Sequence, residues 1–253
     1  MRQNLFYPTW GSYFYPETID EHGNGVLVNL FNIRKQDLLD CAEDQAVGLR
    51  MIDWIHQPLA ADFSYGHFKA VHRYLFQDVY PWAGQERQVS MAKAGHNYYP
   101  AGTALTNAAE QQFSKLTQAD CLRGLDRESF VNQLAEFWGE INVIHSFREG
   151  NTRTQSVFFS QLADAAGHPF SLHKLSQEPL RSEFVQARFY SQDTGSNARL
   201  AEVLDKVIYP KGLTPDRPQT RQAVSDYIQQ RLGQKINKST GYARDYRGRN
   251  PRL

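Results

Sequence analysis

The 253-residue sequence is poor in cysteine and has no long hydrophobic run. Cys41 and Cys121 are too few for a disulfide framework or a metal cluster, so we expect both to be buried free thiols in a reducing compartment. No apolar run approaches the roughly 20 residues of a membrane span, and the first residues lack the pattern of a secretory signal. These absences argue against a membrane protein and a disulfide-rich secreted domain, and they favour a soluble cytoplasmic protein.

Strand patterns are scarce as well, and apolar residues recur mostly at helical spacing. Helices are expected near residues 35–56, 64–79 and 103–117, on both sides of residues 145–156, and once or twice within 180–210. We expect an irregular arm with short strands over residues 1–30, one domain over residues 31–213, and a separate tail over residues 214–253. The fold class is therefore predicted to be mainly α.

Two apolar stripes flank the segment from His145 to Ser156. The stripe before it consists of Phe130, Leu134, Phe137, Ile141 and Ile144, and the stripe after it of Val157, Phe158, Leu162 and Ala165. Asp126 is a natural N-cap for the first helix, and Gly167 stands where the second should end. The segment is therefore predicted to be the elbow of a helix–loop–helix unit that opens at a helix N-terminus.

The elbow carries a base, an acid, a small-residue turn and a guanidinium in one short segment. Backbone N–H groups at a helix N-terminus form an anion site, where Arg153 could neutralise a phosphate and Glu149 could hold a divalent cation. His145 would be the base at its rim. Taken singly, such residues are more often a cap, a turn or a solvated side chain. Their order and spacing between two apolar helices favour phosphate-transfer chemistry.

The run His145-Ser-Phe-Arg-Glu-Gly-Asn-Thr-Arg-Thr-Gln-Ser156 resembles the Fic family motif, His-x-Phe-x-(Asp/Glu)-Gly-Asn-Gly-Arg-x-x-Arg. The segments from Leu75 to Gly84 and from Val157 to Gly167 resemble the family too, and the likeness extends from roughly Phe31 to Pro210. The resemblance implies a Fic fold, which is a helical bundle with a short β-hairpin flap beside the active-site loop.

By position, the resemblance implies a role for each motif residue. His145 matches the general base that deprotonates a target hydroxyl, and Glu149 matches the acid that binds Mg²⁺ at the nucleotide phosphates. The residues expected to bind the phosphates are Gly150, Asn151, Thr152 and Arg153. Most members transfer AMP from ATP to a Ser, Thr or Tyr hydroxyl of another protein. The expected partners are therefore a nucleotide and a target protein.

Two positions depart from the motif, since Thr152 replaces the second glycine and Ser156 the second arginine. Thr would be strained at a position with φ > 0, although it suits a helix cap and its hydroxyl could donate to a phosphate. Ser156 cannot supply a charge-assisted fork, which puts ATP as the donor in doubt.

Three functions stay open. The first is a protein adenylyltransferase. The second is another phosphate-transfer enzyme on the same scaffold, with a different nucleotide or a kinase-like reaction. The third is a binding protein with a weakened site. The motif residues that are intact argue against the third: His145, Glu149, Asn151 and Arg153.

The family's inhibitory helix reads (Ser/Thr)-x-x-x-Glu-(Gly/Asn), and the only Glu followed by Gly or Asn in this sequence is Glu149 within the elbow. Either a small antitoxin-like protein supplies the inhibitory glutamate in trans, or inhibition by glutamate has been lost. A bacterial toxin that is not repressed in cis is therefore expected.

The stretch Arg87–Pro100 matches the flap on which family members dock their target as an added strand. Imperfect alternation over residues 88–93 and a turn at residues 94–97 predict a hairpin. Strand addition gives affinity through main-chain bonds with little choice of sequence. The alternative is an ordinary surface hairpin. The expected docking residues are Val89, Ser90, Met91, Ala92 and Lys93.

Residues 214–253 hold nine Arg or Lys and three Asp, a net charge of +6, whereas the whole chain carries +1. Residues 1–213 therefore carry about −5 by subtraction. Residues 226–232 could form a short helix, and the rest of the tail is expected to be flexible. The tail is interpreted as a solvated segment, as a contact for an acidic partner or nucleic acid, or as a signal for export into a host cell as an effector. Nucleic acid is disfavoured because no nucleic-acid-binding fold is recognisable.

Overall fold

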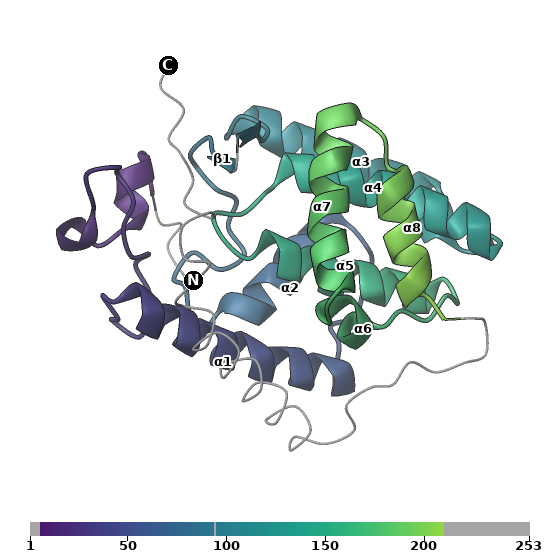
Figure 1. The fold of residues 1–253 in the computed structure, drawn as a ribbon, viewed down its shortest axis with the longest axis horizontal. Helices are drawn as coiled ribbons and strands as arrows, with labels where there is room; N and C mark the ends of the chain where they lie inside the picture. Colours follow the sequence, from purple (N-terminus) through teal and green to yellow (C-terminus); the bar gives the residue numbers. More distant parts are fainter. Residues whose placement is uncertain (1–5, 94, 210–253) are drawn as a thin grey trace. The chain divides into compact units, whose positions relative to one another are not determined.

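The computed structural model describes residues 6–93 and 95–209, and this part of the chain is mainly helical, as predicted (Figure 1). It divides into two compact units. One holds residues 6–59 and 72–102, and the other holds residues 60–71 and 103–209. Helix α2 (Tyr65–Phe76) begins in the second unit and ends in the first. No helix among the described residues is both long and apolar enough to cross a bilayer. The predicted basic tail lies outside the described residues.

The first unit is built on α1 and the turns that follow α2. Its elements are η1 (Trp10–Tyr13), η2 (Pro16–Thr18), α1 (Gln36–His56), the end of α2, β1 (Ala92–Lys93) and β2 (His96–Asn97). Arg50 of α1 forms a two-pronged ion pair with Asp78, with N–O distances of 2.6 and 2.9 Å. The Tyr80 hydroxyl donates to Glu43 of the same helix. These contacts hold α1 against the segment after α2.

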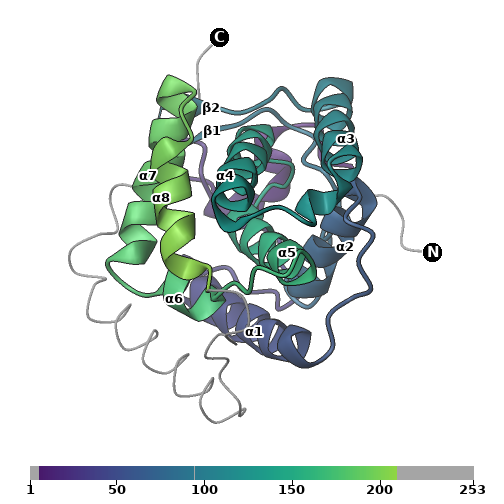
Figure 2. The ribbon, with the colours of Figure 1, turned by 90° about the vertical axis from the view of Figure 1, so that its right-hand side faces the viewer.

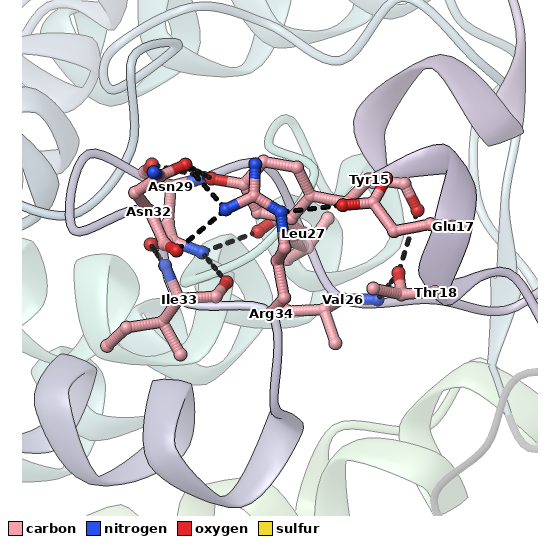
Figure 3. A network of polar contacts seen from close by, with 9 residues as sticks. All are labelled: Tyr15, Glu17, Thr18, Val26, Leu27, Asn29, Asn32, Ile33 and Arg34. Carbon is pink, nitrogen blue, oxygen red and sulfur yellow. Dashed lines mark hydrogen bonds and ion pairs between the residues drawn. The ribbon is translucent and has the colours of Figure 1, made fainter.

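The arm before α1 is ordered by side-chain hydrogen bonds (Figure 3). Asn29 Nδ2 donates to the carbonyl oxygens of Leu27 at 2.9 Å and Ile33 at 2.7 Å, and the Tyr15 hydroxyl donates to Asn29 O at 3.0 Å. The short strands expected over residues 1–30 are replaced, in the described part of the arm, by two 3₁₀ turns and one antiparallel bridge between Phe14 and Leu27. Local polar contacts satisfy the backbone that a strand ladder would otherwise pair.

The second unit is a bundle around α4. Its elements are the start of α2, α3 (Thr103–Gln118), η3 (Asp120–Leu122), α4 (Arg127–Ile144), α5 (Asn151–Ala165), α6 (Leu172–Ser176), α7 (Leu180–Thr194) and α8 (Ala198–Val207). Helix α4 packs against α3, α5, α7 and α8, and α7 runs beside α8 in both views (Figures 1 and 2). The helices predicted near 103–117 and within 180–210 are confirmed, whereas α6 was not predicted.

An aromatic cluster fills the core of this unit between α2, α3 and α5. Phe158 of α5 stands edge-on to Phe63, Phe68 and Phe113, with ring centres 5.4–5.8 Å apart. Phe147, from the loop between α4 and α5, packs on Phe68 with its ring centre 5.4 Å away and is fully buried. The cluster therefore anchors the middle of the elbow to the core.

The predicted apolar stripes are correct except at two positions. Phe137 of α4 is only half-buried, whereas its neighbour Trp138 is fully buried and stacks on Phe159 at 4.7 Å. Ala165, in the last turn of α5, is exposed. Because α4 is enclosed by four helices, its buried surface is wider than one stripe and takes in the larger indole ring.

The expectation of two buried thiols is confirmed for Cys121 and wrong for Cys41. Cys41 lies on α1, two residues from the buried positions Leu39 and Glu43, and is half-buried. Two residues correspond to about 200° around a helix, so Cys41 points away from the face that α1 buries. Both cysteines are free thiols.

Candidate functional site

The elbow joins α4 to α5 as predicted. Asp126 caps α4, since its Oδ1 accepts a hydrogen bond from Ser129 N at 3.0 Å. This bond and a second one from the Ser129 hydroxyl lower the pKa of Asp126 below its usual value. At the far end, Gly167 follows α5 with φ +83°, the left-handed conformation typical of a helix stop. The start of α4 and the end of α5 are therefore set by local sequence.

His145 ends α4 in the left-handed conformation, with φ 50° and ψ 60°. The residue is 8% exposed. Ring atom Nδ1 lies 3.3 Å from the carbonyl oxygen of Asn142, one turn earlier in α4. Because a carbonyl oxygen can only accept, this contact places a proton on Nδ1, so the neutral ring carries its lone pair on Nε2. That tautomer can take a proton through Nε2.

Asn151 ties the loop between the two helices. Its Oδ1 accepts from Phe147 N at 2.9 Å, and its Nδ2 donates to Phe147 O at 2.6 Å. Both bonds are buried, and Asn151 is 3% exposed. This amide closes the loop on itself, so the Asn151 side chain, which was expected to bind phosphate, holds the shape of the loop.

Helix α5 opens with its first N–H groups at the loop. Gly150 is the N-cap, with φ 82° and no side-chain cap. Its positive φ would strain a residue with a Cβ atom. Its carbonyl oxygen accepts from Thr154 N and Thr154 Oγ1, both at 3.0 Å. Thr152 lies inside α5 with a helical backbone, so the strain considered for Thr at that position does not arise.

A carboxylate and a guanidinium lie close together at this helix end. Glu149 Oε1 accepts from Gly150 N at 2.8 Å and lies 3.7 Å from Arg153 Nη2. The two side chains are 39% and 28% exposed, so a ligand can reach both. No group of three or more His, Cys, Asp or Glu side chains suited to a metal occurs in the described parts of the chain. A cation at Glu149 would therefore need oxygen ligands from a bound phosphate, which suits Mg²⁺.

Two residues that the sequence did not single out support the elbow. Gln155 is 1% exposed, and its Oε1 accepts from Trp138 Nε1 at 3.1 Å, which joins α5 to α4. Arg188 of α7 donates from Nη1 to Thr152 Oγ1 at 2.7 Å. A buried Gln facing an indole is a weak sequence signal. Arg188 has none, because it lies 36 residues further along the chain.

The first unit contains the predicted hairpin, but it is shorter than expected. In β1 and β2, Ala92 lies opposite Asn97 and Lys93 opposite His96. The turn predicted over residues 94–97 is therefore wrong, since His96 and Asn97 belong to β2 and only two residues separate the strands. Gly95 supplies the positive φ of +86° that a two-residue hairpin loop favours.

The base of the hairpin is held by Arg87, which is 1% exposed. Its Nη1 donates to Val89 O at 2.9 Å, and its Nη2 donates to Tyr99 O on the other arm. The expected docking residues differ in exposure: Val89 is buried, Ser90 is exposed, and Met91 and Ala92 are half-buried. Of Lys93 only the backbone is described. The hairpin is thus fixed at its base and accessible nearer its tip.

Comparison with known proteins covers both the sequence and the fold. The Fic/DOC family matches residues 62–163. A probable protein adenylyltransferase of Sinorhizobium fredii is 37% identical over 172 residues, which cover 68% of this chain and 86% of that protein. The protein adenylyltransferase VbhT of Bartonella schoenbuchensis is 31% identical over 181 residues, 72% of this chain but only 36% of that protein. The chain therefore spans about a third of the second relative.

The fold is also that of solved Fic domains. The effector protein BepC of Bartonella tribocorum, crystallised with AMPPNP, matches with a TM-score of 0.70 and 21% identity, over 79% of this chain and 97% of that structure. The family match includes α4, the elbow and nearly all of α5. The predicted resemblance to protein adenylyltransferases is confirmed at the level of sequence, and the predicted fold at the level of structure. The chain belongs to the Fic/DOC family.

Proposed function

We propose that this chain transfers the AMP part of ATP to a hydroxyl group of a target protein. The observation that carries the proposal is the elbow, where His145, Glu149 and Arg153 lie within nine residues around the N-terminus of α5. The Sinorhizobium relative that the chain matches over most of its length is named a probable protein adenylyltransferase.

His145 is the general base in this proposal. The hydroxyl oxygen of the target attacks the α-phosphorus, His145 Nε2 takes the hydroxyl proton, and pyrophosphate leaves with the electron pair of the broken P–O bond. The contact from Nδ1 to Asn142 O supports this role, because it keeps the lone pair on Nε2 and fixes the direction of the ring.

The N-terminus of α5 and Arg153 hold the phosphates. Backbone N–H groups of the first turn and a guanidinium are preorganised donors, which stabilise negative charge as it grows on the phosphate. Glu149 is an accessible single carboxylate and fits a Mg²⁺ ion that also binds phosphate oxygens. A bound Mg²⁺ would neutralise part of the phosphate charge. Glu149 must first leave its contacts with Gly150 N and Arg153.

The target segment would pair with the hairpin through main-chain hydrogen bonds. Exposed Ser90 and the half-buried pair Met91 and Ala92 suit an edge that adds a strand with little side-chain selectivity. A small antitoxin-like protein that supplies an inhibitory glutamate is part of the proposal, since the inhibitory motif is absent from the sequence: Glu149 is the only Glu followed by Gly or Asn, and His145 stands where the motif needs Ser or Thr. For localisation, the proposal is delivery into a host cell, because BepC, whose fold is similar, is a translocated effector.

A second candidate function follows from Ser156. This half-buried hydroxyl stands on α5 where the family motif has an arginine, so the outer phosphates would be held differently and another donor or a kinase-like transfer stays open. ATP labelled at the α- or the γ-phosphate distinguishes AMP transfer from a kinase-like transfer.

The test uses the chain, a host lysate, and ATP labelled at either the α- or the γ-phosphate. AMP transfer requires that label on protein depends on His145 with α-labelled ATP only, whereas γ-label that depends on His145 would assign a kinase-like reaction. His145→Asn is the matched variant, because Asn tolerates the left-handed backbone and cannot act as the base. Equal labelling by wild type and His145→Asn would refute the mechanism.

A further inference from the structure

The first turn of α5 is approached by a second guanidinium, from α7. Arg188 Nη1 donates to Thr152 Oγ1 at 2.7 Å, and the guanidinium carbon lies 5.0 Å from the centre of the Phe184 ring, one turn earlier on α7. Arg153, on the same turn of α5, carries the other guanidinium. Two arginines from different helices therefore lie at the helix end where phosphate is expected.

The position of Arg188 matters because α5 lacks the second arginine of the family motif on the same face. Thr152 and Ser156 are four residues apart, so they lie one above the other on the helix surface, and both are half-buried. They are also the two positions at which the sequence departs from the family motif. A guanidinium bound to Thr152 stands at the end of the face where an arginine at position 156 would emerge.

The placement of α7 is built into the packing of the bundle. Phe184 meets Trp138 of α4 edge-on at 5.1 Å. Near the end of α7, the Ser191 hydroxyl donates to Asn197 Oδ1 at 2.5 Å. A Cβ atom at Gly139 of α4 would lie 2.3 Å from that same Asn197 oxygen, so only glycine admits this close approach. The helix that carries Arg188 is thus held against α4.

We propose that Arg188 is a phosphate-binding residue that supplies, from α7, the second outer-phosphate cation that Ser156 cannot supply from α5. The inference rests on the proposed function. A guanidinium has five N–H donors in a fixed fork. Thr152 Oγ1 orients that fork because it accepts a hydrogen bond from Arg188 Nη1. A hydroxyl that accepts a hydrogen bond keeps its own proton, so Thr152 can donate to the phosphate beside Arg188.

If the inference is correct, the chain prefers ATP over AMP. The absence of an arginine at position 156 then no longer argues against ATP as the donor. The outer phosphates of ATP would contact Arg153 and Arg188 together, whereas AMP has no outer phosphate to place there. Loss of one charge-assisted contact should weaken ATP binding by roughly tenfold or more. AMP affinity should be unchanged within about twofold.

Calorimetric titration of ATP and AMP against the full chain tests the inference. Arg188→Gln should lower ATP affinity by at least about tenfold and leave AMP affinity unchanged. Arg181→Gln is the matched control, since it removes the same charge from an exposed position on α7 and should change neither affinity. The double variant Arg188→Gln/Ser156→Arg should recover ATP affinity by returning a guanidinium to that face of α5.

The outcomes separate a ligand contact from a structural tie. Equal weakening of ATP and AMP by Arg188→Gln would show that Arg188 only joins α7 to α5, and no weakening of either would show that it does not reach the phosphates. Both results overturn the inference and leave the proposed function standing. A wild-type chain that binds neither nucleotide overturns both. If Arg188→Gln does not fold, Arg188→Lys keeps the charge without the fork and should still lower the ratio of ATP to AMP affinity.

Discussion

Replacement of Asn151 by alanine should destabilise the elbow and damage nucleotide binding together. The Asn151 amide makes two buried hydrogen bonds to the main chain of Phe147, at 2.9 and 2.6 Å. Without it, one buried N–H and one buried C=O lose their partner. Each such group costs about 1–3 kcal/mol, so we expect Asn151→Ala to lower the free energy of unfolding by about 2–4 kcal/mol.

Urea unfolding followed by tryptophan fluorescence measures this cost, and calorimetric titration measures the accompanying loss of ATP affinity. Asn132→Ala is the control, because Asn132 is exposed on α4 and its replacement should cost less than about 0.5 kcal/mol. Asn151→Asp should be at least as damaging as Asn151→Ala at neutral pH, since it sets a carboxylate against the Phe147 carbonyl oxygen. A cost for Asn151→Ala no larger than that for Asn132→Ala would refute the role of Asn151 in holding the loop.

Three further predictions concern the second unit. Glu149→Gln should abolish Mg²⁺-dependent transfer yet change the free energy of unfolding by less than about 1 kcal/mol, because the ion pair that it removes is half exposed; full turnover of wild type in EDTA would contradict this. Gly139→Ala should lower the free energy of unfolding by about 1–3 kcal/mol through overlap with Asn197, whereas Gly66→Ala on α2 should leave it equal or raise it. The folded-state pKa of Asp126 is lowered, so its stabilisation is complete above about pH 4 and is lost as pH falls further. Asp126→Asn, which still caps α4, should remove that dependence in urea unfolding at several pH values.

Local sequence was enough to predict the elbow. Asp126 and Gly167 act on backbone groups a few residues away, so the start of α4 and the end of α5 follow from neighbouring residues alone. The candidate site lies within residues 145–153, which a single loop brings together. The hairpin was predicted with the wrong turn, because Gly95 and Asn97 are of types common in turns and only the strand register shows that His96 and Asn97 are paired.

Contacts between helices could not be predicted from the sequence. Helical periodicity tells which residues of α5 share a face, but it does not tell which other helix lies against that face. Trp138 therefore proved more deeply buried than Phe137, and Gln155 found its partner 17 residues away. Arg188 reaches Thr152 across 36 residues because α7 packs on α4 at Gly139. The sequence by itself determined the family, most of the helices and the residues of the elbow motif. The tertiary structure decided that the Arg188 side chain lies against Thr152 of that motif, because this contact depends on how α7 packs in the bundle.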